Sequence, residues 1–221
     1  MEFRFGLIGR NISYSFSRDY FTKKFTALGL DNYSYENFDL QNIGEFKDLM
    51  AQNPTIKGFN VTIPYKEGII PFLTDLDAEA KTIGAVNTIK IANDRLIGHN
   101  TDAHGFHKSI APYLEGHHKR ALILGTGGAS KAIAHVLKKM GITYTFISRN
   151  PAREQLNYSD LDGELLRENT ILINCTPLGT YPAIDNRPDI PYQFITPKHL
   201  LYDLIYNPDK TAFLLAGERA G

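Results

Sequence analysis

The apolar and polar residues of the first half of the chain follow a pattern that predicts strands separated by helices. Apolar runs of strand length occur at residues 3–9, 33–40 and 56–62, and stretches with helical spacing lie between them. This alternation is typical of a sheet built from βαβ units. Further along, residues 85–91 and 95–100 flank a turn at Asn93 and Asp94, which predicts a β-hairpin because both residue types tolerate turn backbone angles.

A connector between two halves is predicted next. Thr101 and Asp102 are suited to cap a helix that runs to about Tyr113. Beyond it, residues 120–125 form a predicted strand, and a predicted helix runs from Lys131 to Gly141. Between them stand Gly125, Thr126, Gly127, Gly128, Ala129 and Ser130.

This strand, glycine turn and helix match the fingerprint of a dinucleotide-binding site. Gly125 permits a tight turn, Gly127 lets the backbone approach a pyrophosphate, and the helix N-terminus supplies N–H groups and a favourable dipole. Ser130 departs slightly from the usual Gly or Ala. A plain strand-to-helix turn is the alternative, but the flanking elements stand where the fingerprint requires them, which favours a cofactor site.

The next predicted strand, residues 143–148, indicates which dinucleotide binds. NAD sites usually end this strand with an acid, whereas here Ser148, Arg149 and Asn150 follow, with Arg153 close behind. An arginine matches a 2'-phosphate in charge and in hydrogen-bonding geometry. The sequence therefore predicts NADP. Solvated surface arginines are the alternative, which fits Arg149 less well at this position.

The segment 57–67, KGFNVTIPYKE, contains polar groups at the end of an apolar run. The strand is expected to end at Thr62, Pro64 to break it, and Lys66 to start the following helix, at the carboxyl end where open α/β sheets bind ligands. An exposed helical lysine is the alternative. Asn60 adds a further polar group at the same place.

Two more polar segments accompany Lys66. Asn87 and Thr88 form one, and residues 98–105 form the other. Asp102 in the second segment is interpreted as a helix N-cap, as a site residue, or as both.

Composition narrows the functional class. The 221 residues are 43% hydrophobic, and 24 Lys and Arg balance 24 Asp and Glu, so we expect one large or two small globular cores and no general attraction to nucleic acid or anionic membranes. The N-terminus lacks the apolar run of a signal peptide or membrane helix, and the single cysteine, Cys175, excludes an internal disulfide. A cytoplasmic location is expected.

No metal site is predicted. Four histidines cluster loosely in the middle of the chain, but cysteine partners and a first coordination shell are missing, so a solvated face is expected. Residues 115–120 are expected to form an exposed loop. These histidines are His104, His107, His117 and His118.

Seven ordered segments resemble the shikimate dehydrogenase family over about residues 7–217: YSFS, NVTIPYKE, GAVNT, GHNTDAHG, GTGGAS, INCTPLG and LYDLIYNP. The resemblance implies an α/β fold with an N-terminal βαβ substrate-binding domain, residues 1–101, and a Rossmann-type doubly wound NADP-binding domain, residues 102–221. It also implies reversible NADPH-dependent reduction of 3-dehydroshikimate to shikimate, in aromatic amino-acid and chorismate biosynthesis.

Roles for individual residues follow from the same resemblance. Lys66 and Asp102 would form the catalytic pair, with Asp102 also binding the small-molecule substrate. The other substrate-binding residues would be Ser15 and Ser17, with Tyr206, at the carboxylate, and Thr62 and Asn87 at the ring hydroxyls. The cofactor-binding residues would be Gly125, Thr126, Gly127, Gly128, Ala129, Ser148, Arg149, Asn150, Arg153, Asn174, Thr176 and Leu204.

The sequence departs from the family pattern at several points. Arg18 replaces a proline, and His99 and Ala103 replace other residues in GHNTDAHG, where His99 is expected to be a bystander. Cys175 is expected to be a packed core residue. Family chains continue beyond the equivalent of Gly221 into a return helix; either the chain is truncated before it or its tail was not retained. If the segment is truly absent, we expect lower stability and weak activity, which restoring the segment should reverse.

Two alternatives to a shikimate dehydrogenase stay open. One is a quinate/shikimate dehydrogenase with broader substrate or NAD use, and the other is a non-catalytic homologue that binds NADP or a metabolite. The sequence is equally compatible with a monomer and a homodimer.

Overall fold

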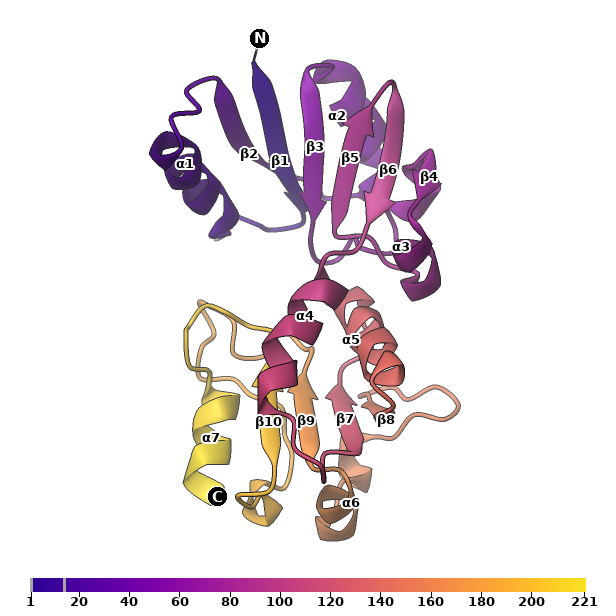
Figure 1. The fold of residues 1–221 in the computed structure, drawn as a ribbon, viewed down its shortest axis with the longest axis vertical. Helices are drawn as coiled ribbons and strands as arrows, with labels where there is room; N and C mark the ends of the chain where they lie inside the picture. The colour runs from indigo at the N-terminus through magenta and orange to yellow at the C-terminus, as the bar shows by residue number, and fades with distance from the viewer. Residues whose placement is uncertain (1, 14) are drawn as a thin grey trace. The chain divides into compact units, whose positions relative to one another are not determined.

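A computed structural model describes residues 2–13 and 15–221 of the chain. The chain divides into two compact units, Met1–Thr101 and Asp102–Gly221. Figure 1 shows a separate sheet in each unit, flanked by helices.

The first unit contains a six-stranded mixed sheet. Its strand order is β2-β1-β3-β5-β6-β4; β1 runs parallel to β2 and β3, and β5 runs antiparallel to β3 and β6. The β5–β6 hairpin turns at Asn93 and Asp94, whose φ angles of 51° and 58° confirm the predicted turn. Its elements are β1 (Phe3–Gly9), α1 (Ser17–Ala27), β2 (Tyr33–Asp39), η1 (Ile43–Glu45), α2 (Phe46–Gln52), β3 (Ile56–Val61), η2 (Ile70–Phe72), β4 (Asp75–Leu76), α3 (Ala78–Ile83), β5 (Thr88–Ala92) and β6 (Arg95–His99).

Two apolar clusters pack against this sheet because its buried strands point side chains to both faces. The larger cluster includes Ile8, Phe46 and Phe59, and the smaller one joins Leu7 and Tyr35 to aromatic residues of α1. The sheet is therefore fixed from both sides, and its ends are left to carry polar residues.

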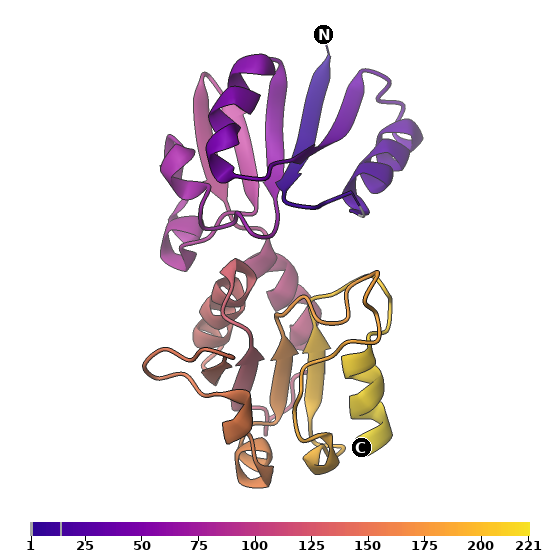
Figure 2. The same cartoon turned by 180° about the vertical axis from the view of Figure 1, so that it is seen from behind.

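The second unit contains a four-stranded parallel sheet with the order β10-β9-β7-β8. In Figure 1, α4 and α5 lie in front of this sheet, and Figure 2 shows the sheet from behind. Phe213 of α7 and Leu166 of α6 pack with Leu122 and Leu124 in one cluster. After β7 the chain adds β8 on one side of that strand, and then adds β9 and β10 on the other side, as in Rossmann-type folds. The elements are α4 (Asp102–Ile110), η3 (Ala111–Tyr113), β7 (Arg120–Leu124), α5 (Gly128–Lys139), β8 (Thr143–Ile147), η4 (Tyr158–Asp160), α6 (Gly163–Glu168), β9 (Ile171–Asn174), η5 (Tyr192–Phe194), β10 (Leu200–Asp203) and α7 (Ala212–Ala220).

Three predicted helix boundaries change. The α-helix expected to reach Tyr113 ends at Ile110 and continues as a 3-10 turn that contains Pro112. The helix expected from Lys131 begins at Gly128, because Gly127 is already the extended N-cap residue. No helix starts at Lys66: a turn follows β3 and leads into the short 3-10 helix η2, where Pro71 lacks the N–H group that a longer helix requires.

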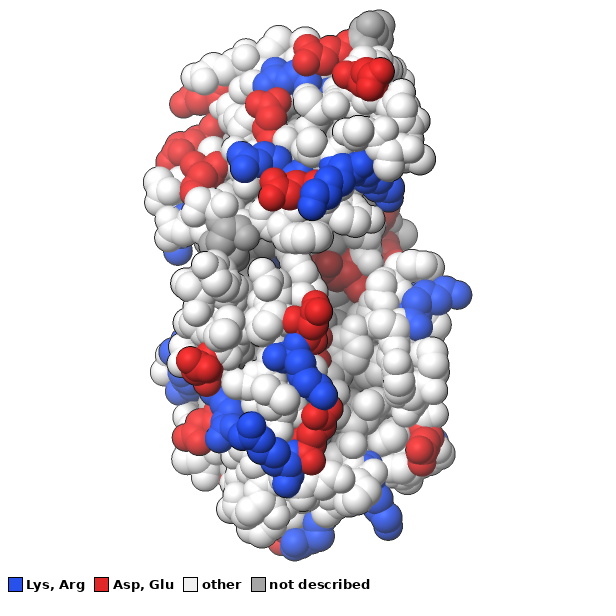
Figure 3. All heavy atoms as spheres, turned by 90° about the vertical axis from the view of Figure 1, so that its left-hand side faces the viewer, with Lys and Arg blue, Asp and Glu red and all other residues white. Residues whose placement is uncertain are grey.

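Three further features bear on the predictions: the charge distribution on the surface, the composition of the helices and the groups of potential metal ligands. On the face drawn in Figure 3, Lys and Arg lie interspersed with Asp and Glu. Within residues 2–13 and 15–221, none of the helices has the length and apolar composition needed to cross a lipid bilayer. The same residues contain no group of three or more His, Cys, Asp or Glu placed to hold a metal ion.

Candidate active site

The ends of neighbouring strands bring several polar residues of the first unit to one edge of its sheet. The Thr62 N–H donates to the Ile8 carbonyl over 2.8 Å, and the Val61 N–H donates to the Asn87 carbonyl, also over 2.8 Å. Thr62 therefore lies beside the end of β1, and Asn87 lies beside the end of β3. Both residues are at the carboxyl end of these parallel strands, where open sheets bind ligands.

Lys66 lies in the turn beside this edge. Its carbonyl accepts a hydrogen bond of 2.7 Å from the Val86 N–H, so the Lys66 turn is fixed to the segment that contains Asn87. The Lys66 side chain is half-buried. The expectation of a helical lysine was wrong, but the lysine lies at the predicted strand end.

The loop after β1 carries Ser15 and Ser17 to the same edge. Asp39, at the end of β2, holds this loop by accepting the N–H groups of Asn11 at 2.8 Å and Ile12 at 3.2 Å. The Ser15 Oγ accepts the Ser17 N–H at 3.2 Å, and both serines are half-buried. Tyr14 of the same motif lies outside the described residues.

Asn87 uses its amide group to hold the end of the first unit. The Asn87 Oδ1 accepts the Thr101 N–H at 2.8 Å, and the Asn87 Nδ2 donates to the Thr101 Oγ1 at 2.8 Å. Asp102 follows as the first residue of α4 and belongs to the second unit. It is therefore not an N-cap but an acid in the first helical turn, where the helix dipole favours a negative charge.

The glycine turn of the second unit combines a glycine of positive φ with open space before a helix. Gly125 has a φ angle of +105°, and a Cβ atom there would lie 3.1 Å from the Thr176 Cγ2. A Cβ atom at Gly127 would meet nothing within 4 Å, so space is open before the first turn of α5. Gly127 has no side chain to cap the first turn of α5. The backbone N–H groups of that turn are therefore suited to an anion.

Ser130, the departure from the usual fingerprint, fits inside α5. It is fully buried, and its Oγ donates to the Gly127 carbonyl over 2.6 Å. The hydroxyl group thus fixes the N-terminal turn of the helix in place of the usual Gly or Ala.

Arg149 follows β8 on a turn with a fixed backbone. The Ser148 Oγ accepts the Asn150 N–H at 3.2 Å, and the Asn157 Nδ2 donates to the Arg149 carbonyl at 3.2 Å. The Arg149 side chain is exposed, as is that of Arg153. Burial raises the pKa of Tyr158, and the positive charge of Arg149 opposes that rise.

The predicted residues after β9 and β10 are placed differently. Asn174 is fully buried, whereas Cys175 is half-buried rather than packed in the core as expected, because β9 ends one residue before it. The Leu204 N–H donates to the Asn174 carbonyl over 3.1 Å. Tyr206 is 64% exposed on the loop after β10, in the second unit and not in the unit that contains the two serines.

Comparison with known proteins decides the family. Residues 7–89 match the model of the shikimate dehydrogenase substrate binding domain. A shikimate dehydrogenase (NADP(+)) of Desulforamulus reducens is 35% identical, over 98% of this chain and 81% of the relative. The chain belongs to the shikimate dehydrogenase family.

Solved structures agree with this assignment to the shikimate dehydrogenase family. Shikimate 5-dehydrogenase from Thermus thermophilus, in complex with NADP(H) and shikimate, matches with a TM-score of 0.84 and 30% identity, over 100% of this chain and 85% of that one. The ligand-free 5-ketofructose reductase of a Gluconobacter species matches with a TM-score of 0.80 and 26% identity, over 100% of this chain and 85% of that one.

In this member of the shikimate dehydrogenase family, three of the four clustered histidines are exposed as predicted, and the fourth, His118, is buried. His118 is 6% exposed; its Nδ1 accepts the Glu115 N–H at 2.8 Å, and its Nε2 lies 3.2 Å from the Lys198 carbonyl. The expected exposed loop is thus tied down because one of its residues is buried. His117 remains exposed.

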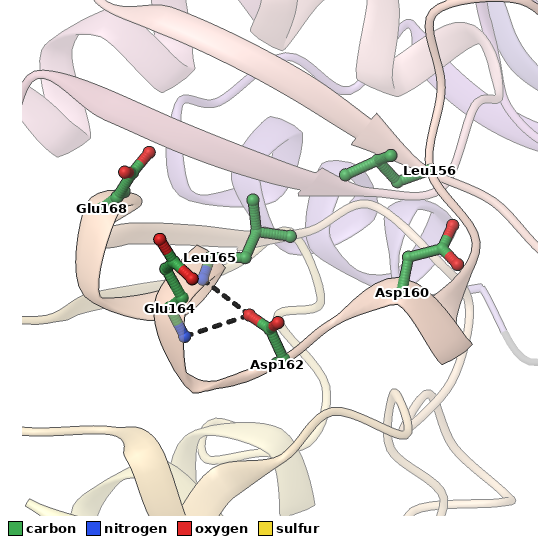
Figure 4. Close-up of a pocket in the computed structure, with 6 residues that line it drawn as sticks. All are labelled: Leu156, Asp160, Asp162, Glu164, Leu165 and Glu168. Carbon is green, nitrogen blue, oxygen red and sulfur yellow. Dashed lines mark hydrogen bonds between the residues drawn. The ribbon is translucent and has the colours of Figure 1, made fainter.

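A hollow of about 280 Å³ lies on the crossover between β8 and β9, and none of the predicted site residues lines it (Figure 4). Asp162 caps α6 there by accepting the N–H groups of Glu164 and Leu165 at 3.0 Å and 2.8 Å. The lining is acidic and would repel the anions NADP and shikimate. The lining residues are Leu156, Asp160, Asp162, Glu164, Leu165 and Glu168.

Four residues that organise these edges were missed by sequence reasoning: Tyr35, Asp39, Asp203 and Thr211. Three of them form hydrogen bonds to residues distant in the sequence, as in the 2.8 Å bond from the Tyr35 hydroxyl to the Asn60 Oδ1, whereas Thr211 donates to the nearby Asp203. The only local signal was an acid at the end of a strand, which marks Asp39 and Asp203.

Proposed function

We propose that this protein is an NADP-dependent shikimate dehydrogenase, which reduces 3-dehydroshikimate reversibly to shikimate. The observation that carries the proposal is the position of Lys66 on the same sheet edge as Ser15, Thr62 and Asn87. An ammonium group, hydroxyl groups and an amide at one edge suit a substrate that carries a carboxylate, a carbonyl and ring hydroxyls.

The second unit supplies the proposed cofactor site. The open space before α5 and the glycine turn fit a pyrophosphate, and Arg149 with Arg153 fits a 2'-phosphate. When bound, NADPH supplies the hydride for the carbonyl carbon at C3. The remaining residues proposed for contact are Thr126, Gly128, Ala129, Ser148, Asn150 and Leu204.

The chain's own residues supply binding and proton transfer. We propose that Ser15 and Ser17, with Tyr206, donate hydrogen bonds to the substrate carboxylate. The Lys66 ammonium stabilises the negative charge that develops on the C3 oxygen and donates the proton to it. Asp102 orients the adjacent hydroxyl and the lysine, while Thr62 and Asn87 hold ring hydroxyls.

The test is oxidation of shikimate by NADP, followed through the nicotinamide absorbance. Turnover with shikimate and NADP, and much slower turnover with NAD, is the expected result. Binding of both ligands in a titration without any turnover would contradict the proposed activity and would support a binding protein.

A second candidate is a dehydrogenase of the same fold with broader substrate use. The similarity to 5-ketofructose reductase favours testing it, because that protein's name denotes a different carbonyl substrate. Quinate and 5-ketofructose are therefore assayed in parallel with shikimate and 3-dehydroshikimate. A higher kcat/KM for either one than for the corresponding shikimate-pathway compound would favour the second candidate.

A further inference from the structure

A carboxylate without a cationic partner lies at the end of β10. The Asp203 side chain accepts hydrogen bonds from the Thr211 Oγ1 at 2.6 Å and from the Ile205 N–H at 3.0 Å, and both of its oxygens lie 3.1 Å from the Asn174 Nδ2. In the part of the chain that the structure describes, Asp203 takes part in no ion pair. Burial raises the pKa of Asp203, although these hydrogen bonds oppose the rise.

Such a half-buried group costs folding free energy, because a charge partly removed from water is stabilised less by neutral donors than by water. An uncharged residue of the same size would avoid that cost. The position of Asp203 is therefore explained by the groups that its hydrogen bonds hold in place.

The carboxylate helps to determine which way the Asn174 amide points, together with the Leu178 carbonyl, which accepts a hydrogen bond from the Asn174 Nδ2 at 3.3 Å. A carboxylate only accepts hydrogen bonds, so Asn174 must turn its NH2 group toward Asp203. This leaves the Asn174 Oδ1 facing Thr176, where it accepts the backbone N–H at 3.0 Å and the hydroxyl at 2.7 Å. Since Asn174 is fully buried, water does not compete for these bonds.

Thr176 in turn packs against the glycine turn. Its Cγ2 lies 3.1 Å from where a Cβ of Gly125 would be, and the Cys175 carbonyl group lies 3.4 Å from the same point. The Cys175 N–H also donates to the Leu124 carbonyl over 2.9 Å. The segment after β9 thus forms one wall of the turn whose shape suits a pyrophosphate.

A second branch of hydrogen bonds leaves Asp203 in another direction. Thr211 is the N-cap residue of α7, and its Oγ1 accepts the Leu214 N–H at 3.4 Å. This branch holds α7 and does not reach Gly125. The two branches are therefore separable by mutation.

We propose that Asp203 is a positioning residue for the cofactor, which acts through Asn174 and Thr176 to hold the wall beside Gly125. The proposal rests on the proposed function, because it takes the glycine turn to be the NADP site. Asp203 and Asn174 act together: Asp203 supplies the charged acceptor that holds the Asn174 amide, and Asn174 in turn holds Thr176.

The experiment measures the Kd for NADPH by titration of nucleotide fluorescence, at a temperature well below the unfolding midpoint of each variant. Asp203→Asn keeps the size but replaces the charged acceptor of the Asn174 NH2 group with a neutral amide, and leaves the Leu178 carbonyl as the other acceptor. We expect the Kd to rise roughly ten- to hundredfold, the effect of losing one hydrogen bond to a charged group. Thr211→Val is the matched control, because it removes a donor to the same carboxylate on the other branch; it should lower stability and leave the Kd near the wild-type value.

The outcomes distinguish a failure of the positioning role of Asp203 from a failure of the proposed enzymatic activity. An Asp203→Asn variant with wild-type NADPH affinity overturns the positioning role, as does an equal rise in Kd for Thr211→Val. A wild-type protein that binds NADPH but turns over no shikimate contradicts the proposed activity while leaving this test intact. A wild-type protein that binds no NADPH overturns both.

Discussion

The Tyr35 hydroxyl donates a 2.8 Å hydrogen bond to the Asn60 Oδ1, and in doing so it reaches from β2 across β1 to β3. The Asn60 Nδ2 lies 3.3 Å from the Thr88 Oγ1, which donates to the Asn87 Oδ1 over 3.1 Å. A line of hydrogen bonds therefore runs along the sheet to a proposed substrate-binding residue.

We expect Tyr35→Phe to lower the free energy of unfolding by about 1–2 kcal/mol, because the partly buried Asn60 Oδ1 loses its donor. The KM for shikimate should rise more than kcat falls, since the change loosens Asn60 and Asn87 and leaves Lys66 in place. Denaturant unfolding and steady-state kinetics check both. Tyr33→Phe is the control, as it removes a hydroxyl from the same strand; an equal effect on KM would contradict the prediction.

Lys66 is the residue proposed to transfer the proton. We expect Lys66→Ala to reduce kcat by about a hundred- to ten-thousandfold, the usual contribution of a positioned acid. Binding of NADP should be unchanged, because the cofactor residues lie in the other unit. Lys57→Ala in β3 is the control for loss of a lysine. Near-normal turnover in a folded Lys66→Ala protein would remove Lys66 from the mechanism.

Arg149 is the residue proposed to select NADP over NAD. Arg149→Ala should raise the KM for NADP about ten- to hundredfold, since charge-assisted hydrogen bonds to the 2'-phosphate are lost. The KM for NAD should change little. Arg167→Ala, an exposed arginine on α6, serves as the comparison variant. If both cofactors were affected equally, Arg149 would not read the 2'-phosphate.

Local sequence patterns were sufficient to predict most of the strands and the glycine turn. The strands at residues 3–9, 33–40 and 56–62 were predicted within one residue, because their apolar runs and their turn residues agree. The glycine turn was also predictable, since the preceding strand and the following helix restrict it. Lys66 lies at the predicted strand end, although Pro71 prevents the expected helix.

Long-range hydrogen bonds account for what the sequence did not reveal. Asn174 was predicted to lie near the cofactor, but its side chain is committed to Asp203 and Thr176, and no spacing rule connects residues 29 positions apart. His118 was expected in an exposed loop, and only the chain near Lys198 explains its burial. Such contacts depend on packing, which hydrophobic periodicity does not encode.

His118 gives the last prediction, a loss of stability in mild acid. Burial, and the neighbouring His117, lower the pKa of His118 below its usual value. The Nδ1 accepts the Glu115 N–H, so a proton on that nitrogen would break the bond. His199 also opposes protonation, while Glu115 and the Lys198 carbonyl favour it.

The sign follows from proton binding. Below about pH 6.5 the unfolded chain takes up a proton at His118 before the folded protein does, so stability should fall as the pH drops from 6.5 to the lowered pKa and then level off for this group. Urea unfolding at pH 5 to 8 measures this. His118→Gln should remove that part of the pH dependence, while His104→Gln on the exposed side of α4 should retain it; an unchanged profile for His118→Gln would show that other groups cause the loss.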